Sequence, residues 1–307
     1  MEEKKSKLDL IMGEDENKQK DVDMTSSKNA LANNSGDFIG EALSDDEKIN
    51  EIMHKSKPII TVLVGFVGYG KTSFLASCYQ ILLDSGSIGD YKFVNSDTLV
   101  GLEKRLYLRR YNERVKDFSP TTARTRRGER HLLDFSFIDK EDKERLIVLS
   151  DHSGEDYQDY VDKKGRIDND KLILNADRIL FFIDSEKLIK PDYLEMFENY
   201  KTLLSNMKQH HVFKKSLEVD LLFNKIDIVQ NHKDDYHQNK DEIIGLFEDI
   251  IEKKIDKIFE VQSNKANDNS ELKACFEYIV SSDSHLKALQ TNNGAELDWV
   301  RNLIKGK

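Results

Sequence analysis

The chain has 307 residues and a net charge of −10, with 57 acidic and 47 basic side chains. This acidic balance disfavours general nucleic-acid binding, and no apolar run approaches the ~20 residues that span a membrane. The length and the 38% hydrophobic content suffice for one well-buried α/β core, and no leader of a charged and then apolar segment opens the chain. Cys78 and Cys275 lie in apolar helical stretches, which is typical of core residues in a reducing compartment. We therefore expect a cytoplasmic protein.

Residues 1–50 are rich in charge and show no sustained apolar period. Such a composition buries too little apolar surface to fold by itself, so a disordered tail is predicted. A weakly ordered docking arm is the alternative.

An apolar, β-branched run ends at Gly65, and the pattern Gly65-x-x-x-x-Gly70-Lys71-Thr72 follows directly. A strand before this pattern and a helix after it form the setting of a phosphate-binding P-loop. Glycines let backbone N–H groups close around phosphate oxygens, while Lys71 reaches the β- and γ-phosphates and the Thr72 hydroxyl ligates Mg²⁺. The predicted nucleotide-binding residues of this loop are Gly65, Val67, Gly68, Tyr69, Gly70, Lys71, Thr72 and Ser73.

The segment 84–118 is long for a link between the P-loop helix and the next functional loop. The spacing of Leu99, Leu102 and Leu106 predicts a helix within it. We favour a helix packed on the sheet, and a lid over the nucleotide or a partner surface is the alternative.

The loop 119–128 precedes a predicted hairpin of residues 129–139 and 143–151. We expect a threonine of this loop to reach the metal. Thr125 is the first candidate because it lies nearest to the following strand, and Thr122 is the second. A solvated basic turn is the alternative interpretation of the loop.

The second strand of that hairpin ends in Asp-x-x-Gly at residues 151–154. Asp151 is predicted to hold Mg²⁺ through water, and the Gly154 N–H is predicted to bond the γ-phosphate. Loss of the γ-phosphate would then release the loop, which is the physical basis of a GTPase switch.

A short apolar strand at residues 219–223 ends in Asn224-Lys225-x-Asp227. The Asp227 carboxylate can accept hydrogen bonds from the N1–H and the amino group of guanine. Adenine lacks both donors and would leave that carboxylate unsatisfied, at a cost of about 1–3 kcal/mol. Lys225 is expected to lie along the purine, and Asn224 to tie this loop to the P-loop. The last base-contacting loop is predicted at Ser263, Asn264 and Lys265.

The remaining pattern alternates strands and helices, which predicts a mainly parallel sheet with helices on both faces. A core strand should end at Asp184, and residues 191–208 and 240–254 are expected to form amphipathic helices. Residues 271–280 should form the last helix of the domain. Beyond it, a short helix is expected whose apolar face consists of Leu297, Val300, Leu303 and Ile304, beside Trp299. This face either packs back on the domain or docks another subunit.

These motifs, in this order, resemble a TRAFAC-class GTPase over about residues 57–280. Three segments more narrowly resemble the bacterial double-GTPase families linked to conflict and defence gene clusters. They are Phe93-x-Asn-Ser-Asp-Thr-Leu-x-Gly101-Leu-Glu-x-Arg105, Ser119-Pro-Thr-x-x-Arg124-Thr125 and Leu149-Ser-Asp151-x-Ser-Gly154-Glu155. The resemblance implies a three-layer P-loop NTPase fold of the Ras-like type with a Mg²⁺–GTP site. The expected organisation is a domain of residues 51–280 with an insertion at about 84–118, between the tail 1–50 and a C-terminal tail or docking helix 281–307.

Two departures from the Ras-like pattern bear on catalysis. Glu155 stands where Ras-like proteins carry the glutamine that orients the attacking water, and an ionised carboxylate cannot donate a hydrogen bond. Unaided hydrolysis should therefore be slow, unless Glu155 only caps the next helix and never contacts water. Val67 stands on the path of an arginine finger, which leaves Arg124, Arg126 and Arg127 as candidates in cis or as plain surface residues.

We expect a GTPase that uses Mg²⁺ and acts as a nucleotide-dependent switch for a protein partner or through self-association. The alternative is a GTP-gated binding or scaffold module with negligible hydrolysis. The residues expected to carry the reaction are Lys71, Thr125, Gly154 and Glu155, and those expected at the metal are Thr72, Thr125 and Asp151.

Overall fold

One mixed sheet forms the centre of the described domain. The computed structural model describes residues 42–43, 58–115, 125, 130–162, 164–263 and 270–282. Its strands are β1 (Ile59–Val64), β2 (Ser87–Ile88), β3 (Tyr91–Asn95), β4 (Arg130–Ile138), β5 (Glu144–His152), β6 (Arg178–Asp184), β7 (Glu218–Asn224) and β8 (Lys257–Val261). They lie in the order β2-β3-β4-β5-β1-β6-β7-β8. The five strands from β5 to β8 are parallel, whereas β2, β3 and β4 extend the sheet antiparallel beyond β5.

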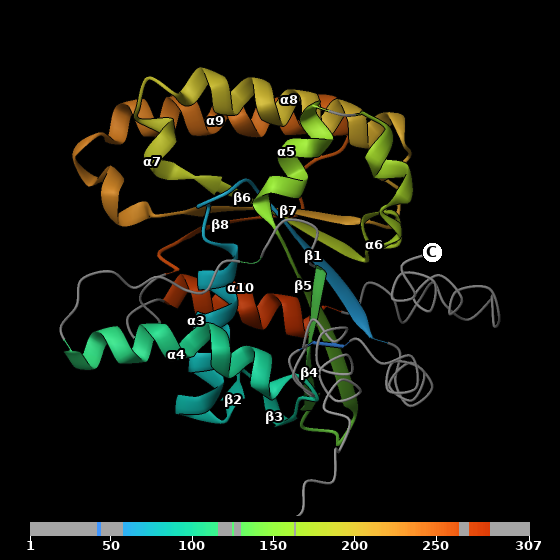
Figure 1. Ribbon diagram of the computed structural model, residues 1–307, viewed down its shortest axis with the longest axis vertical. Helices are drawn as coiled ribbons and strands as arrows, with labels where there is room; N and C mark the ends of the chain where they lie inside the picture. Colours follow the sequence, from blue (N-terminus) through green and yellow to red (C-terminus); the bar gives the residue numbers. More distant parts are fainter. Residues whose placement is uncertain are drawn as a thin grey trace, which may run out of the picture. The chain divides into compact units, whose positions relative to one another are not determined.

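Helices cover both faces of this sheet, as the sequence predicted (Figure 1). One layer contains α5 (Gly154–Asp162), α7 (Ser185–Leu188), α8 (Tyr193–Gln209) and α9 (Lys233–Ile251). The other contains α3 (Lys71–Ser85), α4 (Leu99–Val115) and α10 (Ser270–Ser281). Short turns of helix join these elements, namely η1 (Lys164–Asn169), α6 (Lys171–Leu174) and η2 (Ile226–Asn231). The predicted three-layer α/β P-loop fold is confirmed.

The central strands are apolar because both of their faces are covered. All residues of β6 are buried, and β1 and β7 are buried except for their first residues. This is the composition expected of parallel strands between two helical layers, and burial of these side chains supplies the main favourable term in folding. The sheet thereby holds the carboxyl ends of β1, β5, β6, β7 and β8 at one edge, where the loops of interest begin.

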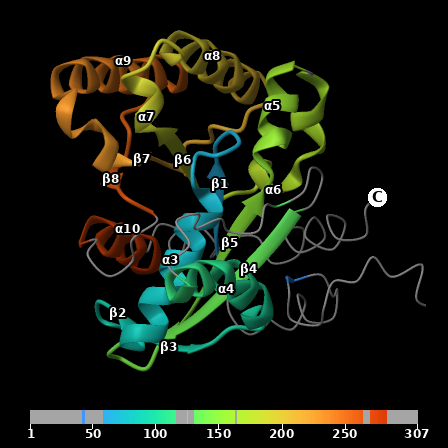
Figure 2. The same ribbon diagram turned by 60° about the vertical axis from the view of Figure 1, so that its left-hand side comes forward.

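The insertion after α3 contributes two strands and a helix. The sequence predicted the helix, and α4 buries Leu102 and Leu106 completely while Leu99 stays 37% exposed. The helix packs against α3 (Figure 2), and its Arg105 also bonds to Asp151 of β5 in the sheet. The strands β2 and β3 were not predicted. They form a tight hairpin around Gly89, which has a φ of 53° that favours glycine.

The helix boundaries match the predictions except in α9. That helix begins at Lys233 rather than at residue 240 and ends at Ile251. Its first turn is polar, so apolar spacing gives no signal there, but Asp234 and Asp235 favour a helix N-terminus and Tyr236 is buried. The last helix, α10, agrees with its prediction to within one residue at each end.

Several expectations concern residues outside the described part of the chain, including most of the tail 1–50 and of the segment 281–307. Within the expected tail, Leu43 is buried, and its N–H donates to the Leu132 carbonyl at 3.0 Å, so this residue packs on the domain.

Cys78 and Cys275 are both buried and carry no disulfide. In the described residues, no helix combines the length and the apolar character needed to cross a membrane.

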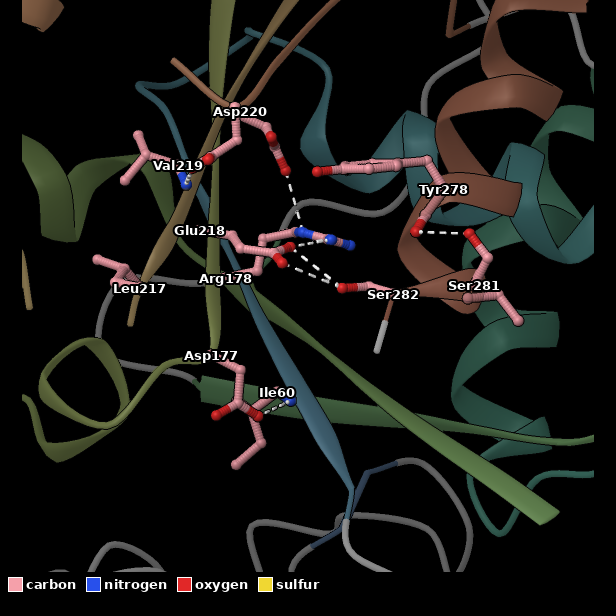
Figure 3. Close-up of polar contacts among 12 residues, drawn as sticks. Ile60, Asp177, Arg178, Leu217, Glu218, Val219, Asp220, Tyr278, Ser281 and Ser282 are labelled. Carbon is pink, nitrogen blue, oxygen red and sulfur yellow. Dashed lines mark hydrogen bonds and ion pairs between the residues drawn. The ribbon is translucent and has the colours of Figure 1, made fainter. Parts of the chain in front are cut away.

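A buried charge cluster lies toward the amino ends of β6 and β7 (Figure 3). Arg178 is 1% exposed, its Nε lies 3.0 Å from the Asp220 carboxylate, and it also pairs with Glu218. The ring of Tyr278 lies 4.3 Å from the guanidinium carbon. One cation thus faces two carboxylates, of which Asp220 is fully buried. Burial, reinforced by the charge of Glu218 and opposed by Arg178, raises the pKa of Asp220 to about 7.

This raised pKa makes the stability of the fold depend on pH. The folded protein binds a proton at Asp220 more tightly than the unfolded chain does. The contribution of Asp220 is therefore complete below about pH 4 and is lost as the pH rises to about 7. In the wild type, Asp220 should lower the free energy of unfolding by an amount on the order of 2 kcal/mol between about pH 5 and about pH 8. Asp220→Asn should not show this decrease, because its amide does not titrate. Urea unfolding of both proteins at several pH values measures this, and parallel curves for variant and wild type would contradict it.

Candidate functional site

The loop between β1 and α3 has the backbone of a phosphate-binding loop. Gly68 and Gly70 have φ values of 82° and 93°, which L side chains rarely adopt. Gly70 begins α3 without a side-chain hydrogen bond, and its carbonyl accepts the first helical bond from the Phe74 N–H at 2.8 Å. The amide groups of the first turn of α3 therefore point out of the helix end, where an anion is stabilised by the N–H groups and by the helix dipole.

The loops that contain Asn224 and Gly154 both pack closely against the P-loop. A Cβ on Gly70 would lie 2.0 Å from the Asn224 side-chain nitrogen, and a Cβ on Gly154 would lie 2.3 Å from the backbone nitrogen of Val67. The Asp-x-x-Gly loop after β5 thus packs directly on the P-loop backbone. Glycine is required at residue 154 by this contact rather than by its φ angle.

Lys71 lies within the loop. Its ammonium group is buried, donates to the carbonyls of Gly65 and Phe66, and lies 5.5 Å from the centre of the Tyr157 ring. Burial lowers the pKa of Lys71 to about 8, and the nearby carboxylates of Asp151 and Asp156 oppose this shift. A buried ammonium on a flexible stem, next to a ring of backbone amides, is well suited to meet a phosphate.

A cluster of oxygen atoms forms around Asp151 at the carboxyl end of β5. The Thr72 hydroxyl donates to Asp151 Oδ1 at 3.3 Å, and the Thr125 hydroxyl donates to Asp151 Oδ2 at 2.8 Å. The three side chains come from α3, from the segment before β4 and from β5, and Asp151 is fully buried. Of the two threonines considered, Thr125 is thus the one that the structure places here, whereas Thr122 lies outside the described residues.

The donor set of this cluster suits Mg²⁺ that is bound together with a nucleotide. It contains hydroxyl and carboxylate oxygens, which are the ligands of a hard cation, but only one carboxylate. The described residues also contain no group of three or more His, Cys, Asp or Glu side chains that could hold a metal ion by themselves. Such a site needs waters and phosphate oxygens to complete the coordination, as Mg²⁺ sites of nucleotide enzymes do.

Arg105 of α4 reaches the same carboxylate. Its Nε lies 2.8 Å from Asp151 Oδ2, and both side chains are buried. Its other nitrogens donate to the Gly101 carbonyl at 2.8 Å and contact His131 Nδ1 at 3.0 Å. From the sequence, Arg105 was named only as the last residue of a segment that carries the family resemblance, and it was not placed in the site. Its position on the buried side of α4, beside Leu102 and Leu106, is the signal that could have found it.

The expected base-binding loops meet the P-loop through Asn224. Its amide nitrogen donates to the Tyr69 carbonyl at 3.0 Å, and its amide oxygen accepts from the Ser263 N–H at 2.9 Å. The expected tie between Asn224 and the P-loop is therefore present. Asp227 is exposed, and Lys225 has a left-handed backbone with its ammonium 2.6 Å from Asp184.

The other predicted site residues are partly or fully exposed, or lie outside the residues that the structure describes. Val67 is 43% exposed and Ser73 is half-buried on α3. Glu155 is exposed in the first turn of α5, and its N–H donates to the Ser153 hydroxyl at 3.3 Å. The residues outside the description are Asn264, Lys265, Arg124, Arg126 and Arg127.

The P-loop, the Asp-x-x-Gly loop and the Asn-Lys-x-Asp loop meet at one edge of an α/β sheet, which defines a GTP-binding G domain. The chain belongs to the Double-GTPase 2 family, whose sequence model matches residues 59–277.

Solved structures similar to the chain are distant. Translation elongation factor SelB from Methanococcus maripaludis, in complex with the GTP analogue GppNHp, is 11% identical with a TM-score of 0.37; the match covers 73% of this chain and 34% of that one. The GTPase-like domain of Ski7 from S. cerevisiae, bound to GDP and inorganic phosphate, is 12% identical with a TM-score of 0.40, and the match covers 70% and 44%. The chain thus spans less than half the length of either structure. No curated protein matches it.

Replacement of Asn224 by alanine should weaken the site. Asn224→Ala leaves the buried Tyr69 carbonyl and Ser263 N–H without their partner, which costs about 1–3 kcal/mol. We expect nucleotide affinity to fall at least about tenfold, because these bonds hold the P-loop and the base loops together. Titration with a fluorescent GDP analogue measures this effect.

Asn175→Ala is the matched control, since its side-chain amide donates to the Lys171 carbonyl of α6, before the amino end of β6 and away from the nucleotide edge. This control should lose some stability and keep its nucleotide affinity. Equal affinities of wild type and Asn224→Ala would contradict the connecting role.

Proposed function

We propose that the protein binds GTP with Mg²⁺, hydrolyses it to GDP and phosphate, and acts as a nucleotide-dependent switch. The observation that carries this proposal is the meeting of Thr72 and Thr125 at Asp151. A P-loop threonine, a threonine from the segment before β4 and the aspartate of Asp-x-x-Gly are the groups that the metal and the γ-phosphate need in one place.

In this proposal each group has a physical task. The amides of the P-loop and the Lys71 ammonium would bind the β- and γ-phosphates, and the hydroxyls of Thr72 and Thr125 would help to hold the metal beside Asp151. Mg²⁺, when bound, neutralises part of the charge on the phosphate oxygens. The Asp151 carboxylate would hold that metal through water.

The switch follows from the contacts of the two loops. Thr125 reaches the site through a hydroxyl contact with Asp151, and Gly154 packs on the P-loop backbone. With GTP bound, Thr125 would also contact the metal, and the Gly154 N–H would also bond the γ-phosphate. Hydrolysis removes the γ-phosphate, and the loops then lose a contact that favours the loaded arrangement.

The alternative of a GTP-gated binding module with negligible hydrolysis has one observation in its favour. Glu155 is exposed at the start of α5, and a carboxylate cannot donate the hydrogen bond that a glutamine amide would give to the attacking water. Turnover is therefore expected to be slow without a partner, and the two functions differ only in the rate of the chemical step.

A change of base preference tests the guanine assignment. In Asp227→Asn, the amide can donate where the carboxylate could only accept. We expect GTP affinity to fall about tenfold or more while affinity for xanthosine triphosphate rises, because xanthine presents an oxygen in place of the guanine amino group. Competition titrations with both nucleotides measure this preference. An unchanged preference for GTP would contradict the role of Asp227.

Single-turnover hydrolysis separates the switch from the gated module. Mg²⁺–GTP is mixed with excess protein at several protein concentrations, and phosphate release is followed for wild type and Glu155→Ala. We expect slow turnover by the wild type and a loss of about a hundredfold in the variant if Glu155 handles water. Lys71→Ala, which should not bind nucleotide, sets the background. Tight GTP binding without turnover at any concentration would favour the gated module.

The wider setting of this function belongs to the same proposal. We assign the GTP-binding domain to residues 51–280, with the insertion at about 84–118 as part of it, and the cytoplasm as its location. The receiver of the switch is a protein partner or a second copy of the chain. A role in bacterial defence is supported by the sequence resemblance stated above.

A further inference from the structure

The insertion that carries α4 is fixed to β4 by a buried carboxylate. Asp134 of β4 accepts from the Thr98 hydroxyl at 2.8 Å and from the Asp97 N–H at 3.0 Å. The Thr98 oxygen in turn accepts from the Asp134 N–H at 3.0 Å, and both side chains are buried. These bonds hold the chain at the beginning of α4 in a set position on the sheet.

Arg105 follows about two turns later and is held from several sides. The Gly101 carbonyl of its own helix and His131 of β4 position the guanidinium, which leaves Nε directed at Asp151. A planar guanidinium with several fixed bonds loses little further freedom when it pairs with a carboxylate. The insertion therefore presents one cation to the carboxylate that the proposed metal site also uses.

Arg105 and the proposed metal would both pair with the negative charge of Asp151. Asp151 Oδ2 accepts from both Arg105 Nε and the Thr125 hydroxyl, each at 2.8 Å, while Oδ1 accepts from Thr72. In a buried site a full positive charge at this distance strongly reduces the attraction of the carboxylate for a second cation. The carboxylate without any cation would be buried and uncompensated, which is strongly unfavourable.

We propose that Arg105 and Mg²⁺ are alternative counter-ions of Asp151, so that loading of the magnesium nucleotide is coupled to release of Arg105 and loosening of α4. The proposal rests on the magnesium–nucleotide site proposed above. In the metal-free protein Arg105 neutralises Asp151 and keeps the site assembled. When the metal binds, Arg105 gives up this bond, and α4 loses its attachment at the nucleotide edge while keeping the one at Asp134.

This coupling sets how much Mg²⁺ the protein needs to retain its nucleotide. The dissociation rate of a fluorescent GDP analogue is measured over a range of free Mg²⁺ concentrations. We expect Arg105→Gln to lower the Mg²⁺ concentration of half-maximal retention by roughly tenfold, because the competing cation is gone. Arg105→Lys, which keeps the charge but not the guanidinium geometry, should lie between this variant and the wild type.

Lys104→Gln is the matched control, since it removes a positive charge from the exposed side of the same helix and should leave the half-maximal concentration unchanged. A half-maximal concentration in Arg105→Gln that equals or exceeds the wild-type value would overturn the proposal. A wild type that fails to bind GDP, or binds it without dependence on Mg²⁺, would instead refute the proposed function.

Hydrogen exchange of the wild type provides a second test that needs no variant. The amides of residues 99–107 are compared in the GDP complex with EDTA and with Mg²⁺. We expect faster exchange with Mg²⁺, since release of Arg105 removes a tertiary contact of α4. Equal or slower exchange with Mg²⁺ would overturn the coupling even if Arg105→Gln did not fold.

Discussion

The buried carboxylate of Asp151 is the constraint on which the nucleotide edge of the structure depends. A fully buried aspartate at the end of a core strand must be surrounded by donors and cations. The donors here are Thr72 from the P-loop helix and Thr125 from the segment before β4, and the cation is Arg105 from the insertion. Parts of the chain that lie far apart in sequence are thereby positioned relative to one group.

The insertion is part of the same core rather than an added lid. Its strands β2 and β3 continue the sheet beyond β4, and its helix packs against α3 with Leu102 and Leu106 buried. Because Asp134 fixes the beginning of α4 and Asp151 binds its middle, the helix joins the sheet at two charged points. Only the second of these lies at the nucleotide edge, so release of Arg105 as proposed would leave the attachment at Asp134 in place.

The sequence predicted those parts of the site whose constraints are local. Gly70 is required by its left-handed backbone and by contact with Asn224, and such requirements leave a fixed spacing in the chain. Arg105 was not predicted, because its partner lies 46 residues later and only tertiary packing brings the two together. The strands β2 and β3 were missed since they are short and largely not buried, which leaves little apolar alternation to detect.

Asp220 and Asp151 are both buried and both pair with an arginine, but they lie at different ends of the sheet. Asp220 lies near the amino end of β7, and Arg178 comes from the adjacent strand β6, so rigid sheet pairing holds the two together. Asp151 lies at the carboxyl end of β5, where its partner comes from an inserted helix and its other bonds come from hydroxyls. Asp151, in contrast, shares its carboxylate with hydroxyl groups that suit a metal, which is the setting that the proposed exchange of cations requires.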